Sequence, residues 1–282
     1  PEYVLILSGD HIYKMDYEVM LDFHKESGAE VTIAAMPVPM EEASRFGIVI
    51  TDDKKKIIDF EEKPEKPRSN LASMGIYIFN WKTLKEALIT MADQPALDFG
   101  KHIIPYCHEK GMPLYAYEYN GYWKDVGTIP SLWEANMEVL DPEHSGINLF
   151  DEDWKIYSRN SGMPGHKICA GANVENSMIT DGCKIAGSVK HSILFAGVKV
   201  EAGAVVEDAV VMGRTTIKAG ASVKHCIVAE NVVIGENAVV GAMPTEEEQG
   251  VATIGPDVCV GTGAKIGSNA MISEDVKDGE EK

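Results

Sequence analysis

Residues 251–273, VATIGPDVCVGTGAKIGSNAMIS, carry an aliphatic residue at every sixth position. The repeating residues are Ile254, Val260, Ile266 and Ile272, and three glycines keep the same period: Gly255, Gly261 and Gly267. One inward aliphatic side chain per six residues, with small residues at the corners, is typical of a parallel β-helix in which three short strands complete one coil. The stretch therefore predicts a hexapeptide-repeat parallel β-helix, which we expect to be left-handed.

The same period extends toward the amino terminus through Val211, Ile217 and Val223. A single repeat cannot bury its own apolar face, so such repeats stack on one another. A Val-rich β-sandwich, the alternative architecture, would instead show a two-residue period and hairpin turns. The segment AMPTEEEQG, residues 242–250, breaks the count and is expected to loop out of a coil.

The first half of the chain has a different pattern, in which apolar runs alternate with helical segments. The run YVLIL (residues 3–7) indicates a central parallel strand that is buried on both faces. A helix is expected between Asp16, as its N-cap, and Gly28, and VTIAAMPV follows as another strand. Further expected elements are a hairpin of residues 47–50 and 56–60, a strand at 73–79, and helices at 81–91, 101–109 and 131–140. These patterns predict a Rossmann-like α/β domain.

Length and composition are consistent with two domains in 282 residues. The composition shifts toward Gly, Val and Ala after Pro142, so we expect an α/β domain over residues 1–141 and a linker with the β-helix over residues 142–282. The net charge of −18 argues against a nucleic-acid surface. No run approaches the length of a membrane span, and a cytoplasmic protein without membrane contact is expected. The five cysteines lack zinc-site spacing and are expected to be reduced.

Four residues of the first half are candidates for phosphate chemistry. Asp10 and Asp125 follow extended runs, and ligands of open α/β sheets bind outside the carboxyl ends of strands. One or two carboxylates plus phosphate oxygens typically hold Mg²⁺ on a nucleotide. Lys63 stands at the mouth of a strand, where an ammonium group can meet a phosphate, and Gly47 would allow a ligand to approach the backbone. Taken singly, each Asp also suits a cap, Lys63 a solvated surface position and Gly47 a turn.

Two other motifs point to different enzyme classes. Asp98, Phe99 and Gly100 spell a kinase tripeptide, but no H-R-D loop precedes them. His191 and His225 lie in the repeats, where an acyltransferase would place a base, but packing or surface roles are the more common ones for single histidines. The residues by themselves thus predict a metal-dependent, phosphate-handling α/β domain joined to a β-helix, with no substrate specified.

Six strings occur in order along the first half: SGDHIYKMDY (8–17), RFGIV (45–49), FEEKP (60–64), SMGIYIF (73–79), DFGKHIIP (98–105) and YWKDVGTI (122–129). Together they resemble the bacterial glucose-1-phosphate adenylyltransferase (ADP-glucose pyrophosphorylase) family, whose second domain the repeat half also resembles. The resemblance implies transfer of AMP from ATP to α-D-glucose 1-phosphate, giving ADP-glucose and pyrophosphate in glycogen biosynthesis. It also implies a homotetramer with sugar-phosphate allosteric control.

The resemblance implies roles for individual residues as well. Asp10 and Asp125 would hold Mg²⁺, and Lys63 would contact the sugar phosphate, so that these three residues carry the catalysis. Glu62 and Ser73 would bind the glucosyl hydroxyls. Further residues would line the same pocket: Gly47, Tyr77, Asp98, Phe99 and Trp123.

Two features depart from the family pattern. His102 stands where the family more often has an acid. The Gly-rich G-x-G-x-R-L loop that cradles a triphosphate does not occur in this sequence, so we expect the catalytic domain to be incomplete at its amino-terminal side and the chain to be inactive. The alternative functions are another sugar-1-phosphate nucleotidyltransferase, or a non-catalytic regulatory or assembly module of the same family.

Overall fold

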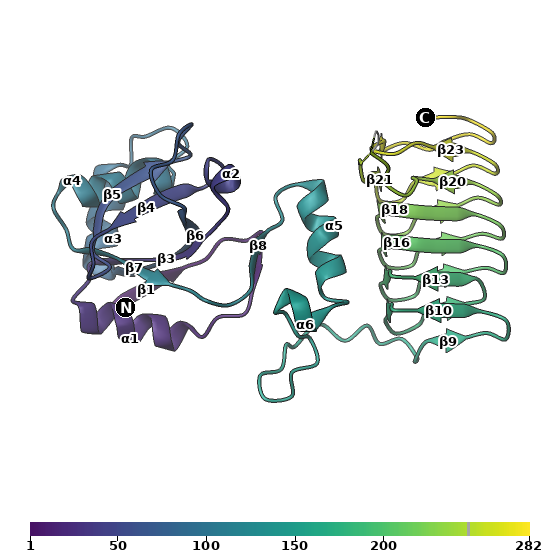
Figure 1. The fold of residues 1–282 in the computed structure, drawn as a ribbon, viewed down its shortest axis with the longest axis horizontal. Coiled ribbons are helices and arrows are strands. Elements are labelled where there is room, and N and C mark those ends of the chain that lie inside the picture. The colour runs from purple at the N-terminus through teal and green to yellow at the C-terminus, as the bar shows by residue number, and fades with distance from the viewer. Residues whose placement is uncertain (247–248) are drawn as a thin grey trace. The chain divides into compact units, whose positions relative to one another are not determined.

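The computed structural model describes residues 1–246 and 249–282, which form two compact units (Figure 1). The first unit comprises residues 1–123 and the second residues 124–282, so the boundary lies within the short strand β8 (Trp123–Asp125). The domain boundary expected at residue 141 stays a prediction. Within the described ranges, no helix has the length and apolar character needed to cross a membrane.

A six-stranded mixed sheet forms the centre of the first unit, with the order β5-β4-β6-β3-β7 and β1 paired to β6. Its strands are β1 (Tyr3–Ile6), β3 (Val31–Pro37), β4 (Gly47–Thr51), β5 (Ile57–Glu62), β6 (Leu71–Asn80) and β7 (Leu114–Glu118). The helices of the unit are α1 (Tyr17–Ser27), α2 (Met40–Ala43), α3 (Trp81–Thr90), the π-helix η1 (Phe99–Ile103) and α4 (Ile104–Glu109). Strand β2 (His11–Tyr13) pairs with β8 outside this sheet.

Local sequence signals explain several of these elements. Helix α1 begins after Asp16, whose carboxylate accepts a hydrogen bond from the Glu18 N–H at 2.9 Å, and ends at Gly28 in the left-handed conformation. The predicted hairpin is formed by β4 and β5, which pair antiparallel with Gly47 opposite Glu62. Both predictions are confirmed.

The prediction for the first strand is wrong. β1 pairs antiparallel with β6, and Leu5 is 38% exposed, whereas a parallel strand buried on both faces was expected. Strand β6 lies between β1 and β3, so these two strands are not neighbours. An apolar run of this length does not reveal the direction of its partner.

The second unit is a parallel β-helix with three strand faces (Figure 1). The first face is formed by β9 (Lys167–Ile168), β12 (Lys184–Ile185), β15 (Lys199–Val200), β17 (Thr216–Ile217), β19 (Val233–Ile234) and β22 (Cys259–Val260). The second is formed by β10 (Asn173–Glu175), β13 (Ser188–Lys190), β16 (Val205–Val211), β18 (Ser222–Val228), β20 (Val239–Val240) and β23 (Lys265–Ile266). Strands β16 and β18 continue into the third, with β11 (Met178–Ile179), β14 (Ile193–Leu194), β21 (Ala252–Ile254) and β24 (Met271–Ile272).

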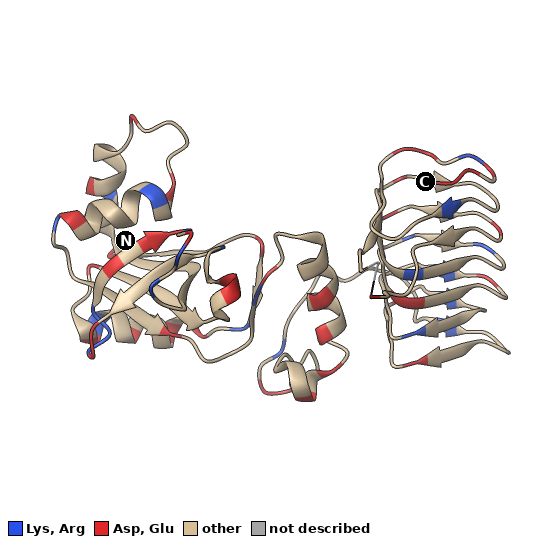
Figure 2. Cartoon of the chain, turned by 45° about the horizontal axis from the view of Figure 1, so that its top comes forward, with Lys and Arg blue, Asp and Glu red and all other residues tan. Residues whose placement is uncertain are grey.

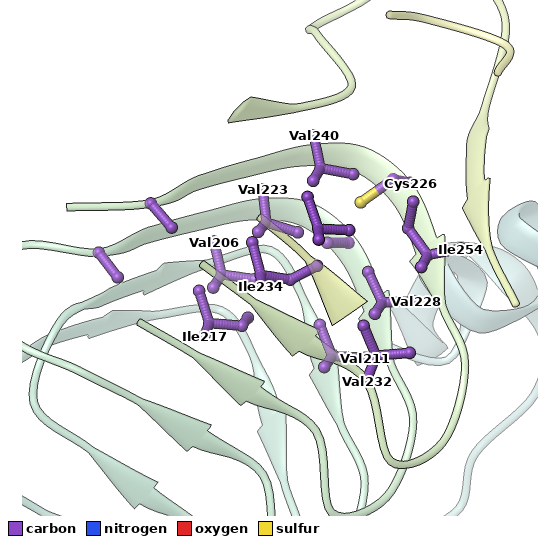
Figure 3. Close-up of a cluster of buried hydrophobic side chains, with 14 of the residues drawn as sticks. Val206, Val211, Ile217, Val223, Cys226, Val228, Val232, Ile234, Val240 and Ile254 are labelled. Atoms are coloured by element: carbon purple, nitrogen blue, oxygen red, sulfur yellow. The ribbon is translucent and has the colours of Figure 1, made fainter. Parts of the chain in front are cut away.

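The core of this unit consists of stacked aliphatic side chains (Figure 3). Ile217 and Val223 are fully buried, and Ile254, Val260 and Ile266 are nearly so, as the six-residue period predicts. The prediction of a parallel β-helix is thus confirmed, while its handedness stays a prediction. Of the expected loop at 242–250, residues 247 and 248 lie outside the described residues; β20 and β21 on either side both pair with β18.

Two helices precede the coils within the second unit, α5 (Ile129–Glu138) and α6 (Pro142–Ser145). Helix α5 packs on the third face of the β-helix, where Met137 meets Val210 and Ile227. The Trp133 ring lies edge-on to His225, with ring centroids 4.4 Å apart, and His191 hydrogen bonds the Asp208 side chain. His225 is therefore buried against α5, whereas His191 is partly exposed and paired with Asp208.

Candidate active site

The half-buried carboxylate of Glu62 is the centre of the first group of predicted residues. Glu62 ends β5 opposite Gly47 at the start of β4. A Cβ atom added to Gly47 would lie 3.0 Å from Oε2 of Glu62, and a Cβ atom added to Gly100 would overlap the same oxygen. Both glycine backbones therefore lie against the same carboxylate, and a side chain at Gly100 would displace it.

Strand β6 and the start of η1 supply the other members of this group. The Asp98 carboxylate caps η1 by accepting a hydrogen bond from the Lys101 N–H at 2.8 Å. The Phe99 ring stacks on that of Tyr77, with centroids 5.7 Å apart and planes at 22°. Ser73 lies near enough to Tyr77 to lower the pKa of its hydroxyl, against the larger effect of burial, and both residues are buried. We call Gly47, Glu62, Ser73, Tyr77, Asp98, Phe99 and Gly100 the Glu62 cluster.

The electrostatics of the Glu62 cluster oppose ionisation of Glu62 and Tyr77. Burial raises the pKa of Glu62, and the nearby Asp98 carboxylate raises it further, while Lys63 and Lys101 act in the opposite direction. Burial also raises the pKa of Tyr77, which keeps its hydroxyl protonated. The cluster thus combines two acid side chains, two hydroxyls and an aromatic pair.

Lys63 lies at the edge of this cluster. Its backbone adopts φ = 46°, a conformation that is uncommon for a residue other than glycine, and its N–H donates to the Phe46 carbonyl at 3.1 Å. The side chain is exposed, and none of the ion pairs recorded within residues 1–246 and 249–282 involves its ammonium group. Strained backbone of this kind is concentrated at binding sites.

The second group of predicted residues surrounds Asp10. Its carboxylate accepts a 2.7 Å hydrogen bond from the Ser8 hydroxyl, which lowers the pKa of Asp10. His11 lies beside it, and because a carbonyl can only accept, His11 Nδ1 donates to the Met74 carbonyl at 2.9 Å. The Trp123 ring stands edge-on to His11, with centroids 5.3 Å apart. Trp123, predicted for the sugar pocket, therefore contacts the histidine next to Asp10.

Asp10, His11 and Asp125 offer one ligand atom each, and these atoms all lie within 4.8 Å of one another. Asp10 and His11 stand at the start of β2, and Asp125 ends its partner β8. Two carboxylates suit a hard cation such as Mg²⁺, whereas the imidazole suits a transition metal as well. The donor set therefore fits a divalent cation.

Sequence reasoning missed His11 and Gly100. His11 lies inside one of the six quoted strings, but no spacing pattern singles it out. Gly100 carried a usable signal, because glycine in the first turn of a helix is unfavourable unless another group occupies the space of its side chain. That group is the Glu62 carboxylate.

Comparison with known proteins agrees with this geometry. The model of the family described as nucleotidyl transferase matches residues 1–142, which is half of the chain. The chain belongs to the nucleotidyl transferase family. A second model, described as GlmU-like C-terminal hexapeptide, matches residues 166–261 of this nucleotidyl transferase.

Curated relatives carry a more specific name. The chain is 61% identical over 201 residues to "Glucose-1-phosphate adenylyltransferase" of Lachnospira eligens. The aligned residues cover 71% of this chain and 47% of the relative. It is 58% identical over 214 residues to proteins of the same name from Bacillus cereus strain Q1 and Bacillus anthracis. The aligned residues cover 75% of this chain and 57% of each relative. The resemblance inferred from the six strings is thereby confirmed, and the chain spans about half the length of these relatives.

Proposed function

We propose that this nucleotidyl transferase binds glucose 1-phosphate and takes part in its adenylylation by ATP to ADP-glucose and pyrophosphate, a step of glycogen biosynthesis. The gathering of the Glu62 cluster carries the proposal. Its residues come from β4, β5, β6 and η1, and apart from Trp123 the residues that the resemblance implies for a sugar pocket lie there around one carboxylate.

The chemistry of the cluster suits a phosphorylated sugar in one orientation. Sugar hydroxyls donate well to the carboxylates of Glu62 and Asp98, and the Tyr77–Phe99 pair offers an apolar surface. A phosphate would be repelled by the two carboxylates and attracted by Lys63. We therefore place the hydroxyls toward Glu62 and the phosphate toward Lys63.

For catalysis we propose that Asp10 and Asp125 hold Mg²⁺, which when bound would neutralise charge on the transferring phosphates. The sugar-phosphate oxygen would attack the α-phosphorus of ATP in line, so the main task of the protein is to position both substrates. Lys63 would hold the attacking phosphate. No covalent nucleophile is required.

The homotetramer and the sugar-phosphate effector implied by the resemblance belong to the same proposal. Side chains of the first coil that are exposed in the single chain, such as Ile168 and Val174, are consistent with a contact between copies. Sedimentation equilibrium, with and without a sugar bisphosphate, tests both parts.

Lys63→Gln tests the proposed function, with Lys66→Gln as a matched control at a neighbouring exposed lysine. Loss of one charge-assisted contact should weaken glucose 1-phosphate binding by about ten- to a hundredfold in isothermal titration. Lys66→Gln should bind like the unmodified chain.

Three other outcomes decide between the alternatives. Equal binding by both variants would mean that Lys63 does not contact the phosphate. A preference for a different sugar 1-phosphate would indicate another transferase of the family. Absence of binding to any sugar phosphate would favour the non-catalytic module.

A further inference from the structure

Asp98 exchanges hydrogen bonds with Lys101 and His102 in the first turn of η1. The Asp98 carboxylate accepts from the Lys101 N–H at 2.8 Å, and the Asp98 N–H donates to Nδ1 of His102 at 3.1 Å. Reciprocal bonding of this kind resembles a capping box, in which the side chain of a Glu or Gln three residues after the N-cap accepts a hydrogen bond from the backbone N–H of the N-cap residue. Here His102, four residues after Asp98, accepts the hydrogen bond from the cap N–H.

The π-helical turn explains the change in spacing. The Ile104 N–H bonds to the carbonyl of Phe99, five residues earlier, so this turn holds one residue more than an α-turn. The side chain that faces the cap therefore belongs to the fourth residue instead of the third. Because the Asp98 N–H is the donor of this bond, Nδ1 of His102 is its acceptor and carries no proton.

The same turn is packed on the Glu62 carboxylate. Gly100 lies so close to Oε2 of Glu62 that no side chain fits between them, and Asp98 is the charged neighbour that acts most strongly on Glu62. A displacement of the first turn of η1 would therefore move both acid groups of the Glu62 cluster.

We propose that His102 is a positioning residue for the sugar. Its Nδ1 holds the main chain of Asp98, and through Gly100 the carboxylate of Glu62, in the arrangement that accepts hydrogen bonds from sugar hydroxyls. His102 acts through these residues without touching the sugar. This inference rests on the proposed function of the Glu62 cluster.

Two variants separate the acceptor from the rest of the side chain. His102→Asn keeps an acceptor, because Oδ1 of asparagine is as many bonds from Cα as Nδ1 of histidine. His102→Leu removes the acceptor at similar volume. His108→Leu is the matched control, since His108 is an equally half-buried histidine in the following helix α4.

We expect His102→Asn and His108→Leu to bind glucose 1-phosphate within about threefold of the unmodified chain, and His102→Leu to bind about tenfold more weakly. Loss of a cap alone lowers stability and leaves affinity of the folded protein unchanged, so the melting temperature is measured beside each titration. If His102→Leu fails to fold, His102→Ala replaces it, because alanine also lacks a side-chain acceptor and favours a helix.

The outcomes distinguish this inference from the proposed function. If the unmodified chain does not bind glucose 1-phosphate, or binds it without sensitivity to Lys63→Gln, the proposed function fails. If binding is sensitive to Lys63→Gln but His102→Leu binds normally, only the positioning role of His102 is overturned. Equal weakening by His102→Asn and His102→Leu would also overturn it, because the acceptor would then be irrelevant.

Discussion

One oxygen of the Glu62 side chain lies against the backbones of Gly47 and Gly100, which come from different elements. The contacts leave this carboxylate half-buried, and Asp98 adds a second negative charge nearby. An acid in such surroundings is costly to ionise. Its retention at this position is consistent with a binding role, because a neutral side chain would be more stable there.

Glu62→Gln tests the free-energy cost of ionising Glu62 in the folded chain. Because burial raises the pKa of Glu62 in the folded chain, the folded state binds more protons than the unfolded state as pH rises from about 4 toward 7, and stability falls over that window. The glutamine variant cannot ionise, so its melting temperature should fall less between these pH values and be the higher at pH 7. Solvent screening keeps the expected gain below about 1 kcal/mol. The exposed Glu65→Gln variant is the control, and a pH profile of Glu62→Gln parallel to that of the unmodified chain would contradict the assignment.

At the scale of elements, two rows of charged residues run across the β-helix strands, where charges of both signs are visible (Figure 2). On the second face the in-register row alternates in sign: Glu175, Lys190, Glu207 and Lys224. Glu207 forms ion pairs with both neighbouring lysines, at 3.9 and 3.2 Å. On the first face the in-register row contains three like charges: Lys167, Lys184 and Lys199. Opposite charges across strands stabilise a sheet, and like charges destabilise it.

Glutamine substitutions in the two rows should have opposite signs. Lys184→Gln relieves repulsion from two neighbours and should raise the free energy of unfolding by about 0.2–1 kcal/mol at low salt, whereas Glu207→Gln should lower it by a similar amount. Both effects should shrink at about 1 M salt, where the Debye length is about 3 Å. Thermal denaturation at two salt concentrations measures this, and changes of the same sign would show that the register does not control the charge energy.

At the scale of the whole molecule, each of the two units has its own buried core. Ile33 is fully buried in the first and Ile217 in the second. We expect calorimetry to resolve two unfolding transitions. Ile33→Ala should lower the free energy of unfolding of the first unit alone, and Ile217→Ala that of the second unit alone. Each loss should be about 2–5 kcal/mol. A single transition lowered by both variants would show that the units unfold as one.

The sequence by itself was sufficient wherever the deciding signal is local. The six-residue period predicts the coils because each strand of a β-helix pairs with the strand at the same position in the next coil. Asp16 and Gly28 delimit α1 because a cap acts on the nearest backbone groups. The quoted strings predicted most members of the Glu62 cluster through family resemblance, although nothing local shows that Gly47 and Asp98 meet at Glu62.

Only the tertiary structure decided which distant segments pair. β1 runs antiparallel beside β6 because its direction depends on its partner and not on its own apolar residues. Asn80 precedes α3, but its side chain does not cap the helix. Its amide nitrogen instead donates a 2.9 Å hydrogen bond to the carboxylate of Glu30, the residue before β3. Gly100 and His102 acquire their roles from the π-turn packed on Glu62. Periodicity reports which face of an element is buried, whereas a site depends on contacts between elements that the folded chain alone brings together.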